Sequence, residues 1–588
     1  MIFVALETAR GFLWRCGFNS GSDKKSAVYM SELIEWYANE TALSGAFVPH
    51  IFASMQDNTA SVVKAGRLVE KNCHVVWLNC TLHMVALIST NIFNRVPYAA
   101  ALLAQLETLT SYVRIRPRVS NMLKTLVAET ESAKRHANPD AKCTKATTLL
   151  RVIPTRMLTA RACFLRVVVF EESLRKLFSK NGKLKDYYYE DLDVAGRTEF
   201  DAIAAIAKDD DFYHGAQFMV EVLTPVLQML RFLDRQSSLS RDTYKLMRFA
   251  SDSVAVVLGR KKFQTVPSVK NKMIILDVVA DVWARHQCPG HLASWFLNPR
   301  ERETIVRIAL SHDDDDQDEY IRAKAGERET IVRIALSHDD DQDEYIRAKA
   351  DTLHVIETII RRMGRFDSKL DVERAIDQAD VQLLQYVMDP KSGGFSLQAI
   401  EALSPEAWWA AQGNKILCRV ARITQVWPAG TGNLERSMKI NALVHNKHRG
   451  GLSLDNADTL VRGYVAQVAV GLKPLWDDEK IAKFWDTFSN LSEDEEADVD
   501  RWHALLGRYN RTVAATIVTG EARPEQKSAM PSAEAYVSDD EKEESLPIHE
   551  EAVEAEDELE VAQEEPRRSK RSPGLSRRFR EMVAALKE

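Results

Sequence analysis

A near-continuous helical periodicity, running from about Pro97 to about Ser396, constrains the fold of this chain more than any other feature. Through this region apolar residues recur at intervals of three and four, for example at Leu102, Leu106, Leu109 and Val113. Such spacing places apolar side chains on one face of an α-helix. We expect helices over Ala101–Val113 and Ala162–Phe178, inside a large all-α region that covers residues 97–396.

The first 96 residues follow a different pattern, in which short apolar runs alternate with helical segments. Four runs of strand length are predicted, namely Met1–Leu6, Gly11–Cys16, Phe47–Met55 and His74–Leu78. The helical segments between them are Ser26–Tyr37 and Thr59–Glu70. Alternation of this kind is typical of an α/β layer. The predicted fold class is therefore α/β plus a large all-α insertion, mostly helical overall.

The composition is that of a mainly globular chain. Its 588 residues suffice for two or three domains, and 45% of them are hydrophobic and 28% charged. The net charge of -7 does not indicate a nucleic-acid-binding protein, although acidic blocks can hide basic segments. The seven cysteines have no framework spacing, and neither a signal peptide nor an apolar run near 18 residues is evident. We expect a soluble protein of a reducing compartment, without membrane contact.

Asp57 lies just past the end of an apolar strand, where functional side chains are often placed. Its carboxylate can cap the next helix through a side-chain oxygen, or it can bind a metal ion. Cys80 and His83 follow the next strand and are three residues apart. A buried cysteine beside a hydrogen-bonded histidine is the ordinary interpretation of that pair. A structural zinc site shared with Cys73 and His74 is disfavoured, because the strand between the two pairs points them apart.

The stretch from Trp408 to Val468 combines a tryptophan pair, an apolar helix, a turn and a second helix. The two helices are separated by a breaker run of Pro428, Gly430 and Gly432. Glu435 and Arg436 stand near the start of the second helix. A glutamate at that position is also favoured simply because its charge suits a helix N-terminus.

The order of these residue types resembles the transposases of the hAT superfamily. In that family an Asp-Asn pair ends a strand, a Cys-x-x-His opens the helix after the next strand, and the C-terminal block carries a late Glu. Thr155-Arg156 resembles a short motif of the family's inserted helical domain, although Met157 stands where the family commonly has an aromatic residue. The resemblance covers Met1 to about Val470.

The resemblance implies an RNase H-like core, in which carboxylates hold two divalent ions for DNA cleavage and strand transfer. It makes Asp57 and Glu435 ligands of Mg²⁺ or Mn²⁺, side by side at the rim of the sheet, and implies no small-molecule cofactor. The supporting residues that it implies are Cys80, His83, Arg156 and Arg436. Two departures from the family pattern, Thr431-Gly432 and Gly450-Gly451, loosen the segment around Glu435.

The family also uses an Asp on the first strand of its sheet. Met1 corresponds to the second strand of that pattern, so we expect an incomplete RNase H-like mixed sheet that lacks its first strand and the first Asp. The strands at Met1–Leu6 and Phe47–Met55 would each lose a hydrogen-bonding neighbour. No BED-type zinc finger precedes the sheet. The active site is therefore predicted to be incomplete.

A tandem duplication interrupts the helical region. Glu301–Ala325 recurs as Glu327–Ala350 with one Asp fewer. Because working solenoid repeats normally come as three or more units, the pair 301–325/327–350 indicates a recent duplication or an assembly error. The acidic runs Asp313–Asp316 and Asp339–Asp341, each preceded by a His, are expected to form solvated loops, because neighbouring carboxylates repel one another.

Five regions are predicted. They are a partial RNase H-like sheet domain (1–96), the helical insertion (97–396), hAT-type dimerisation and closing helices (397–480), a short helical extension (481–518) and a disordered acidic tail (519–588). The tail is rich in Glu, Asp, Ser and Pro and has few large apolar residues. It contains a basic run, Pro566–Arg571, that is compatible with nuclear import.

The first functional hypothesis is a nuclear, transposase-derived protein of hAT type that is catalytically inactive. It would form a homodimer or higher oligomer through residues 404–468. DNA binding, if retained, would use basic clusters at Arg114, Arg116, Arg118 and Lys124, or at Arg260, Lys261 and Lys262. Two alternatives stay open: an active metal-dependent DNA transposase whose N-terminal strand has been omitted, and a helical protein-interaction scaffold.

Overall fold

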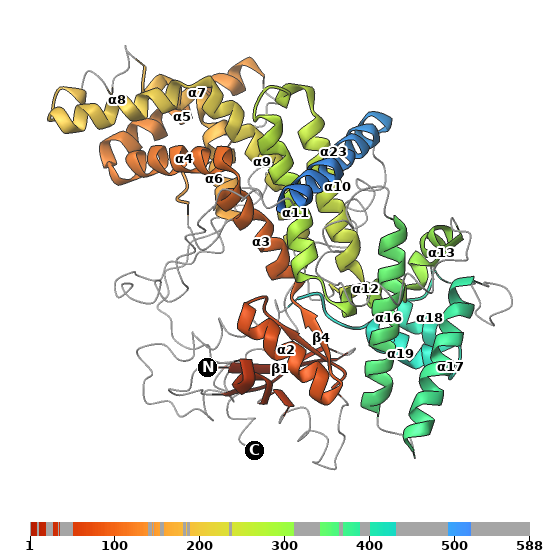
Figure 1. Cartoon of the computed structure of the whole chain (residues 1–588). Coiled ribbons are helices and arrows are strands. Elements are labelled where there is room, and N and C mark those ends of the chain that lie inside the picture. Colours follow the sequence, from red (N-terminus) through yellow and green to blue (C-terminus); the bar gives the residue numbers. More distant parts are fainter. Residues whose placement is uncertain are drawn as a thin grey trace, which may run out of the picture.

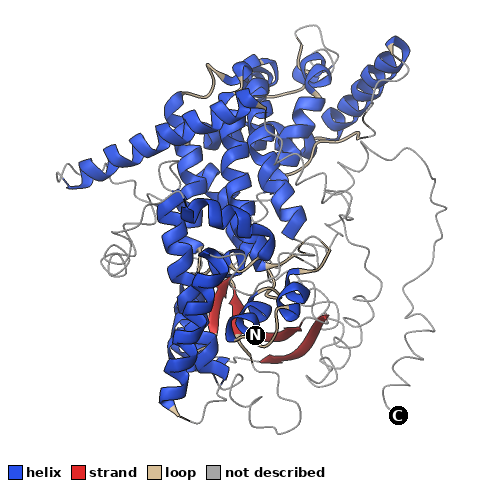
Figure 2. Cartoon of the chain, turned by 90° about the vertical axis from the view of Figure 1, so that its right-hand side faces the viewer, coloured by secondary structure: helices blue, strands red, loops and turns tan. Residues whose placement is uncertain are grey.

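The computed structural model describes residues 2–8, 11–18, 27–32, 34–35, 51–138, 144, 146–152, 158–179, 184, 188–233, 238–310, 341–363, 368–388, 400, 402–430 and 492–518. Within these residues the chain is mostly helical, and the strands form two small two-stranded sheets (Figure 2). The expectation of a mostly helical chain with a small strand-containing part is confirmed.

The predicted N-terminal hairpin is present. Strands β1 (Ile2–Thr8) and β2 (Gly11–Phe18) pair antiparallel, with Thr8 opposite Gly11 at the turn. Of the helix expected over Ser26–Tyr37, residues 27–32 and 34–35 are described, and they are helical.

A β-α-β unit follows and positions the candidate site. Strands β3 (Ala53–Gln56) and β4 (Val76–Asn79) are parallel, and helix α2 (Ala60–Cys73) connects them. Within the described residues β3 and β4 pair only with each other. Strand β4 begins later than predicted because His74, in the left-handed conformation with φ 53°, ends α2 and donates its N–H to the carbonyl of Glu70.

The helical part begins directly after β4 (Figure 1). A proline in the first turn starts α4, α5, α12 and α18, where its missing N–H costs no helical hydrogen bond. The helices are α3 (Thr81–Arg95), α4 (Pro97–Ile115), α5 (Pro117–Ala137), α6 (Leu158–Val169), α7 (Glu171–Leu177), α8 (Val194–Lys208), α9 (Asp210–Leu233), α10 (Thr243–Gly259), α11 (Val269–His286), α12 (Pro289–Phe296), α13 (Arg302–Leu310), α16 (Asp341–Met363), α17 (Lys369–Met388), α18 (Pro405–Ala411), α19 (Ile416–Thr424) and α23 (Glu493–Val518).

The prediction of a single helix over Ala162–Phe178 is wrong. Helices α6 and α7 share this range and are broken at Phe170, whose φ of -93° and ψ of 6° are not helical. Helix α6 packs mainly against α9, whereas α7 packs against α5 and α8. Because the two halves have different partners, tertiary packing overrides a periodicity that is continuous in the sequence.

One hydrophobic core runs through most of the described helices. It extends from Val76 in β4 to Leu506 in α23 and includes the fully buried Trp408 and Trp409 of α18. Helix α19 packs against α12, α16 and α17. Helices from both sides of the predicted boundary at residue 396 therefore share this core.

Length and hydropathy alone would allow one helix within the described ranges, α9, to cross a membrane. Of its most apolar 18-residue window, 61% is buried inside the protein. Helix α9 packs against α6, α10 and α3. We therefore interpret α9 as a core helix of the helical part.

Several predictions fall outside the described residues. They concern the positions of Arg156, Glu435 and Arg436, the second helix after the breaker run, the run Asp313–Asp316 and the acidic tail 519–588. Of the duplicated segment, the described residues are the first half of the first copy, in α13, and the second half of the second copy, in α16.

Candidate functional site

The carboxyl ends of β3 and β4 bring together three residues that the sequence singled out. Asp57 follows β3 directly, Cys80 follows β4, and His83 lies in the first turn of α3. Because the strands are parallel, their carboxyl ends meet at the same edge of the sheet. Ligands of α/β sheets commonly bind at this edge.

His83 stands between the other two side chains. Its Nε2 lies 3.6 Å from Asp57 Oδ1, and its Nδ1 lies 3.2 Å from Cys80 Sγ. The side chains of His83 and Asp57 are 35% and 45% exposed, whereas Cys80 is fully buried. The imidazole and the carboxylate can therefore meet solvent or a ligand, and the thiol cannot.

Asp57 does not cap the following helix, so that interpretation was wrong. The N-cap of α2 is Thr59, and no side chain accepts a hydrogen bond there. Instead Asp57 Oδ1 accepts the backbone N–H of Asn58 over 2.6 Å. The Asn58 amide in turn donates to the carbonyl of Cys80 over 3.1 Å. This network joins the two loops that follow β3 and β4, which holds Asp57 near His83.

The order Cys80, His83, Asp57 is that of a nucleophile, a base and an orienting acid. A nucleophile must reach its substrate, however, and the thiol is covered by Gly430. A Cβ added to Gly430 would lie 3.5 Å from Cys80 Sγ and 3.2 Å from the Cβ of Leu82. The geometry gives Cys80 the role of holding the His83 ring, not of attacking a substrate.

The cover over Cys80 belongs to a short extended segment, Trp427–Gly430, which we name the 427–430 strap. It is held on one side by residues 238–240: Ser240 N–H donates to the Trp427 carbonyl over 2.8 Å, and Ala429 N–H donates to the Ser238 carbonyl over 3.1 Å. On the other side Thr81 N–H donates to the Ala429 carbonyl over 2.9 Å. The strap therefore bridges α3 and the segment before α10.

The strap leads toward Glu435, which is five residues beyond Gly430. Five extended residues span at most about 18 Å. Glu435 itself lies outside the described residues. The juxtaposition of Asp57 and Glu435 thus stays a prediction.

A second Cys-x-x-His, formed by Cys288 and His291, was missed in the sequence. Here His291 Nε2 donates to the carbonyl of Asn79 over 2.9 Å, and the Asn79 N–H lies 3.5 Å from Cys288 Sγ. The Asn79 amide donates to the carbonyl of His286 over 2.6 Å. The connection between α11 and α12 thereby holds the last residue of β4, next to Cys80. The repeated spacing of Cys80 and His83 was the signal that could have revealed it.

Burial determines the protonation of this second pair. It lowers the pKa of His291 to about 4 and raises the pKa of the Cys288 thiol to about 12. Both groups are therefore neutral near pH 7, and their role is to fix β4. Between these two residues, a Cβ at Gly290 would lie 2.2 Å from Leu78 Cδ2, so a larger residue there would force the buried Leu78 side chain to shift.

The described ranges contain no group of three or more His, Cys, Asp or Glu side chains arranged to hold a metal ion. Strand β4 lies between the pair Cys73-His74 and the pair Cys80-His83, as expected. A carboxylate such as Asp57 is the ligand type that Mg²⁺ and Mn²⁺ prefer. Asp57 is exposed enough to bind such an ion if further oxygen ligands approach.

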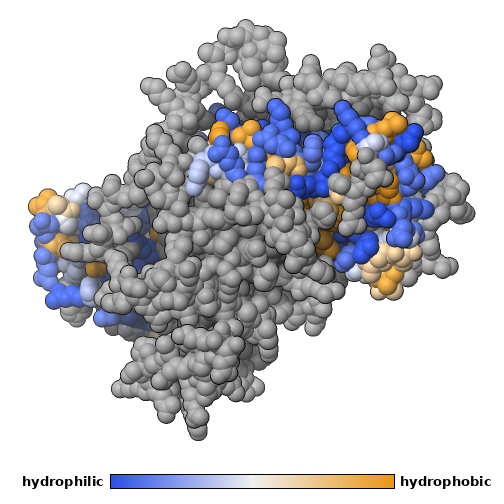
Figure 3. All heavy atoms as spheres, turned by 90° about the horizontal axis from the view of Figure 1, so that it is seen from below, coloured by the Kyte–Doolittle hydropathy of each residue, from blue (hydrophilic) through white to orange (hydrophobic). Residues whose placement is uncertain are grey.

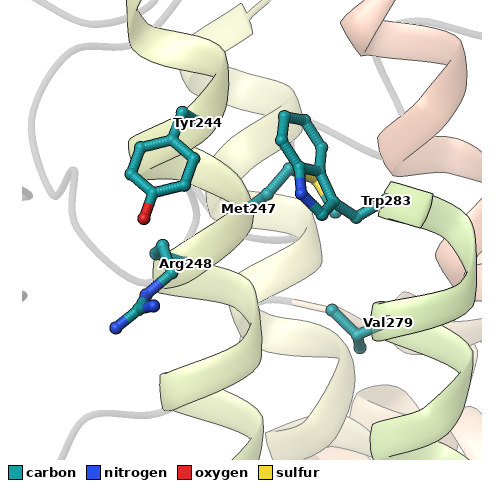
Figure 4. Close-up of a pocket in the computed structure, with 5 residues that line it drawn as sticks. All are labelled: Tyr244, Met247, Arg248, Val279 and Trp283. Atoms are coloured by element: carbon teal, nitrogen blue, oxygen red, sulfur yellow. The ribbon is translucent and has the colours of Figure 1, made fainter. Parts of the chain in front are cut away.

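A shallow depression elsewhere on the surface lies between α10 and α11 (Figure 4). It is lined by Tyr244, Met247 and Arg248 from α10 and by Val279 and Trp283 from α11. Arg248 is the one charged residue of this lining, so the depression offers no paired acid and base. It is separate from the site at Asp57.

Acidic partners neutralise much of the predicted basic surface. Arg116 pairs with Glu199 at 2.6 Å, and Arg260 and Lys262 both pair with Glu221. Arg118 lies 3.6 Å from Asp191. Ion pairs of this kind reduce the positive potential that attracts phosphate groups.

The chain as a whole matches no protein-family model and no curated protein.

Proposed function

We propose that this protein derives from a hAT-type transposase, and that it keeps the dimerisation and a weak DNA association of that class without performing strand transfer. The observation that supports the proposal most is the hydrogen bond from Thr81 N–H to the Ala429 carbonyl. It brings the chain segment before Glu435 to the sheet edge at which Asp57 lies. A core of this class needs a late carboxylate to return to that edge.

The sheet arrangement is a second support. An antiparallel hairpin, β1–β2, and a parallel pair, β3–β4, are separate two-stranded sheets. In an RNase H-like sheet one further strand would lie between β1 and β3. The two observed pairs fit the strands on either side of it.

The candidate ligands in this sequence are Asp57 and Glu435, whereas strand transfer in the resembled class uses three carboxylates around two ions. We accordingly expect weak binding of Mg²⁺ or Mn²⁺. When bound, such an ion would stabilise negative charge on phosphate oxygens. His83, held by Cys80, would limit the positions that the Asp57 carboxylate can take.

Titration of the full chain with Mn²⁺, followed by electron paramagnetic resonance, tests the shared site. We expect Asp57→Ala and Glu435→Ala each to weaken Mn²⁺ binding about tenfold or more, because each removes a charged ligand. Glu172→Ala, at an exposed glutamate of α7, is the matched control and should bind as the parent does. If only one of the two substitutions, or neither, changes the binding, the two carboxylates do not share a site and the proposal fails.

The remaining parts of the proposal are tested separately. Sedimentation velocity should detect a homodimer that depends on residues 404–468. Fluorescence anisotropy with duplex DNA should detect binding that weakens steeply with salt. A fluorescent fusion that loses nuclear accumulation when Pro566–Arg571 is replaced would support nuclear import.

A helical protein-interaction scaffold is the second candidate function. The continuous core shared by most of the described helices favours it, because such a body can present rigid surfaces without any catalytic chemistry. A protein that binds neither Mn²⁺ nor DNA, yet is folded and stable, would favour the scaffold over the transposase-derived protein.

A further inference from the structure

Helix α17 has two faces with apolar residues, and the fold uses one of them. The buried face packs against α16, α19 and α13 and includes Ala375, Ala379, Leu383 and Val387. The opposite face is exposed and carries Leu370, Arg374, Asp377, Val381 and Leu384. These five follow one another at intervals of four, three, four and three residues, which is the spacing of one seam of a coiled coil. We name them the α17 seam.

The apolar members of the α17 seam are unusually exposed. Leu370 is 58%, Val381 54% and Leu384 42% exposed. Helix α17 lies at the outer edge of the molecule (Figure 1), and from below the described surface alternates between hydrophilic areas and separate hydrophobic patches (Figure 3). Single exposed apolar residues are ordinary, but three on one seam indicate a contact surface.

We propose that the α17 seam is an interface with a second copy of this chain, in which the two α17 helices pack antiparallel about a two-fold axis. In an antiparallel pair, facing residues have a constant sum of their numbers. With the axis between Arg374 and Asp377, Arg374 faces Asp377 of the second copy, and Leu370 faces Val381. By symmetry each of these layers occurs twice.

Charge order along the helix selects this partner and this orientation. In the antiparallel pair both central layers join an arginine to an aspartate, and both outer layers join two apolar side chains. In a parallel pair Arg374 would face Arg374 and Asp377 would face Asp377, which places like charges together. The side chain of Arg374 is 70% exposed, and its ion pair within the described residues is with the neighbouring Asp371, at 3.5 Å, so it can extend across the interface.

This interface is independent of the proposed dimerisation through residues 404–468. A seam of four layers is smaller than a standard interface, so we expect a weak association that depends on protein concentration. A chain that uses both surfaces would form species larger than a dimer.

Charge exchange in the full-length protein tests the proposal by sedimentation equilibrium. Arg374→Glu or Asp377→Arg alone places like charges in both central layers and should weaken the association about tenfold. The double variant R374E/D377R restores opposite charges and should restore the parent association. Lys176→Glu, which makes the same charge change as Arg374→Glu at an exposed side chain of helix α7, is the control. If neither single variant weakens the association, or if the double variant does not restore it, the proposal is overturned.

Disulfide trapping identifies the pairing directly. Cys16 and Cys143 are first replaced by Ser, and the cysteines of the described core, Cys73, Cys80, Cys163, Cys288 and Cys418, are buried and remain. A chain with Leu370→Cys, mixed with a chain of different mass that carries Val381→Cys, should give a linked heterodimer. Linkage of Leu370→Cys chains to each other instead would show a parallel pair and refute the antiparallel interface. The disulfide link between the two α17 helices does not depend on dimerisation through residues 404–468. The α17 interface and the proposed function are therefore tested separately.

Discussion

The backbone N–H of Thr81 donates to the carbonyl of Ala429 over 2.9 Å, which joins the start of α3 to a segment far along the chain. An N–H in the first turn of a helix has no acceptor within its own helix, so the strap supplies one. The same bond closes the cover over Cys80. It therefore links the stability of the fold to the geometry at Asp57.

Enlarging Gly430 should loosen this contact. In Gly430→Val the added atoms press on Leu82 and Cys80 Sγ, and we expect a loss of about 1–3 kcal/mol in the free energy of unfolding. Gly430→Ala, whose Cβ contacts are tight but not overlapping, should lose less. Urea denaturation measures both, and equal stability of all three proteins would show that the strap does not cover Cys80.

The hydroxyl pair formed by Thr81 and Thr243 should behave as a coupled unit. Their Oγ1 atoms are 2.9 Å apart and buried. Thr81→Val leaves the partner hydroxyl without its hydrogen bond and should cost about 1–3 kcal/mol. The double variant T81V/T243V should cost less than the sum of the single changes. Additive costs in a double-mutant cycle would contradict the coupling.

Stability should fall in mild acid because of His291. The pKa of His291 is about 4 in the folded protein, below the value of 6.5 that a histidine has in an unfolded chain. As the pH falls, the unfolded chain therefore takes up a proton at this residue before the folded protein does. The stabilising contribution is present in full above pH 6.5 and is lost as the pH falls toward 4, by about 3 kcal/mol. Burial lowers the pKa of His286 in the same direction. His291→Gln should flatten the profile of unfolding free energy between pH 7 and pH 4.5, and an unchanged profile would exclude His291 as its main cause.

Removing one unit of the duplication should leave the fold intact. Helix α13 carries the first part of the repeated unit, from the first copy, and the start of α16 carries its last part, from the second copy. Deletion of residues 311–336 joins Leu310 to Ser337 and keeps that unit continuous. Since the length of the connection between two packed helices affects stability only weakly, we expect a change within about 1 kcal/mol. Circular dichroism and urea denaturation measure the effect, and loss of helical content would show that the extra copy is structural.

Local sequence patterns predicted the helices and strands better than they predicted where one helix ends and the next begins. The spacing of Leu102, Leu106 and Leu109 identified α4, and the alternation of the first 96 residues identified the unit that contains β3 and β4. Both signals come from neighbouring residues. The break at Phe170 gave no such signal, because it depends on which helices α6 and α7 contact.

The site divides in the same way. Asp57, Cys80 and His83 were found because strand ends and the Cys-x-x-His spacing are local, and the structure brings the three together. The sequence did not predict the hydrogen bond between His291 and the Asn79 carbonyl, nor that Gly430 lies over Cys80. Each joins residues far apart in the chain.

By itself, then, the sequence determined the helical character of most of the described residues and the three residues at the strand ends, since periodicity and short spacings act through neighbouring residues. The tertiary structure alone decided that the 427–430 strap lies against α3, and that one face of α17 is exposed while the other is buried. Such contacts are selected by the packing of the whole core, in which each buried side chain must fit partners that no local pattern specifies.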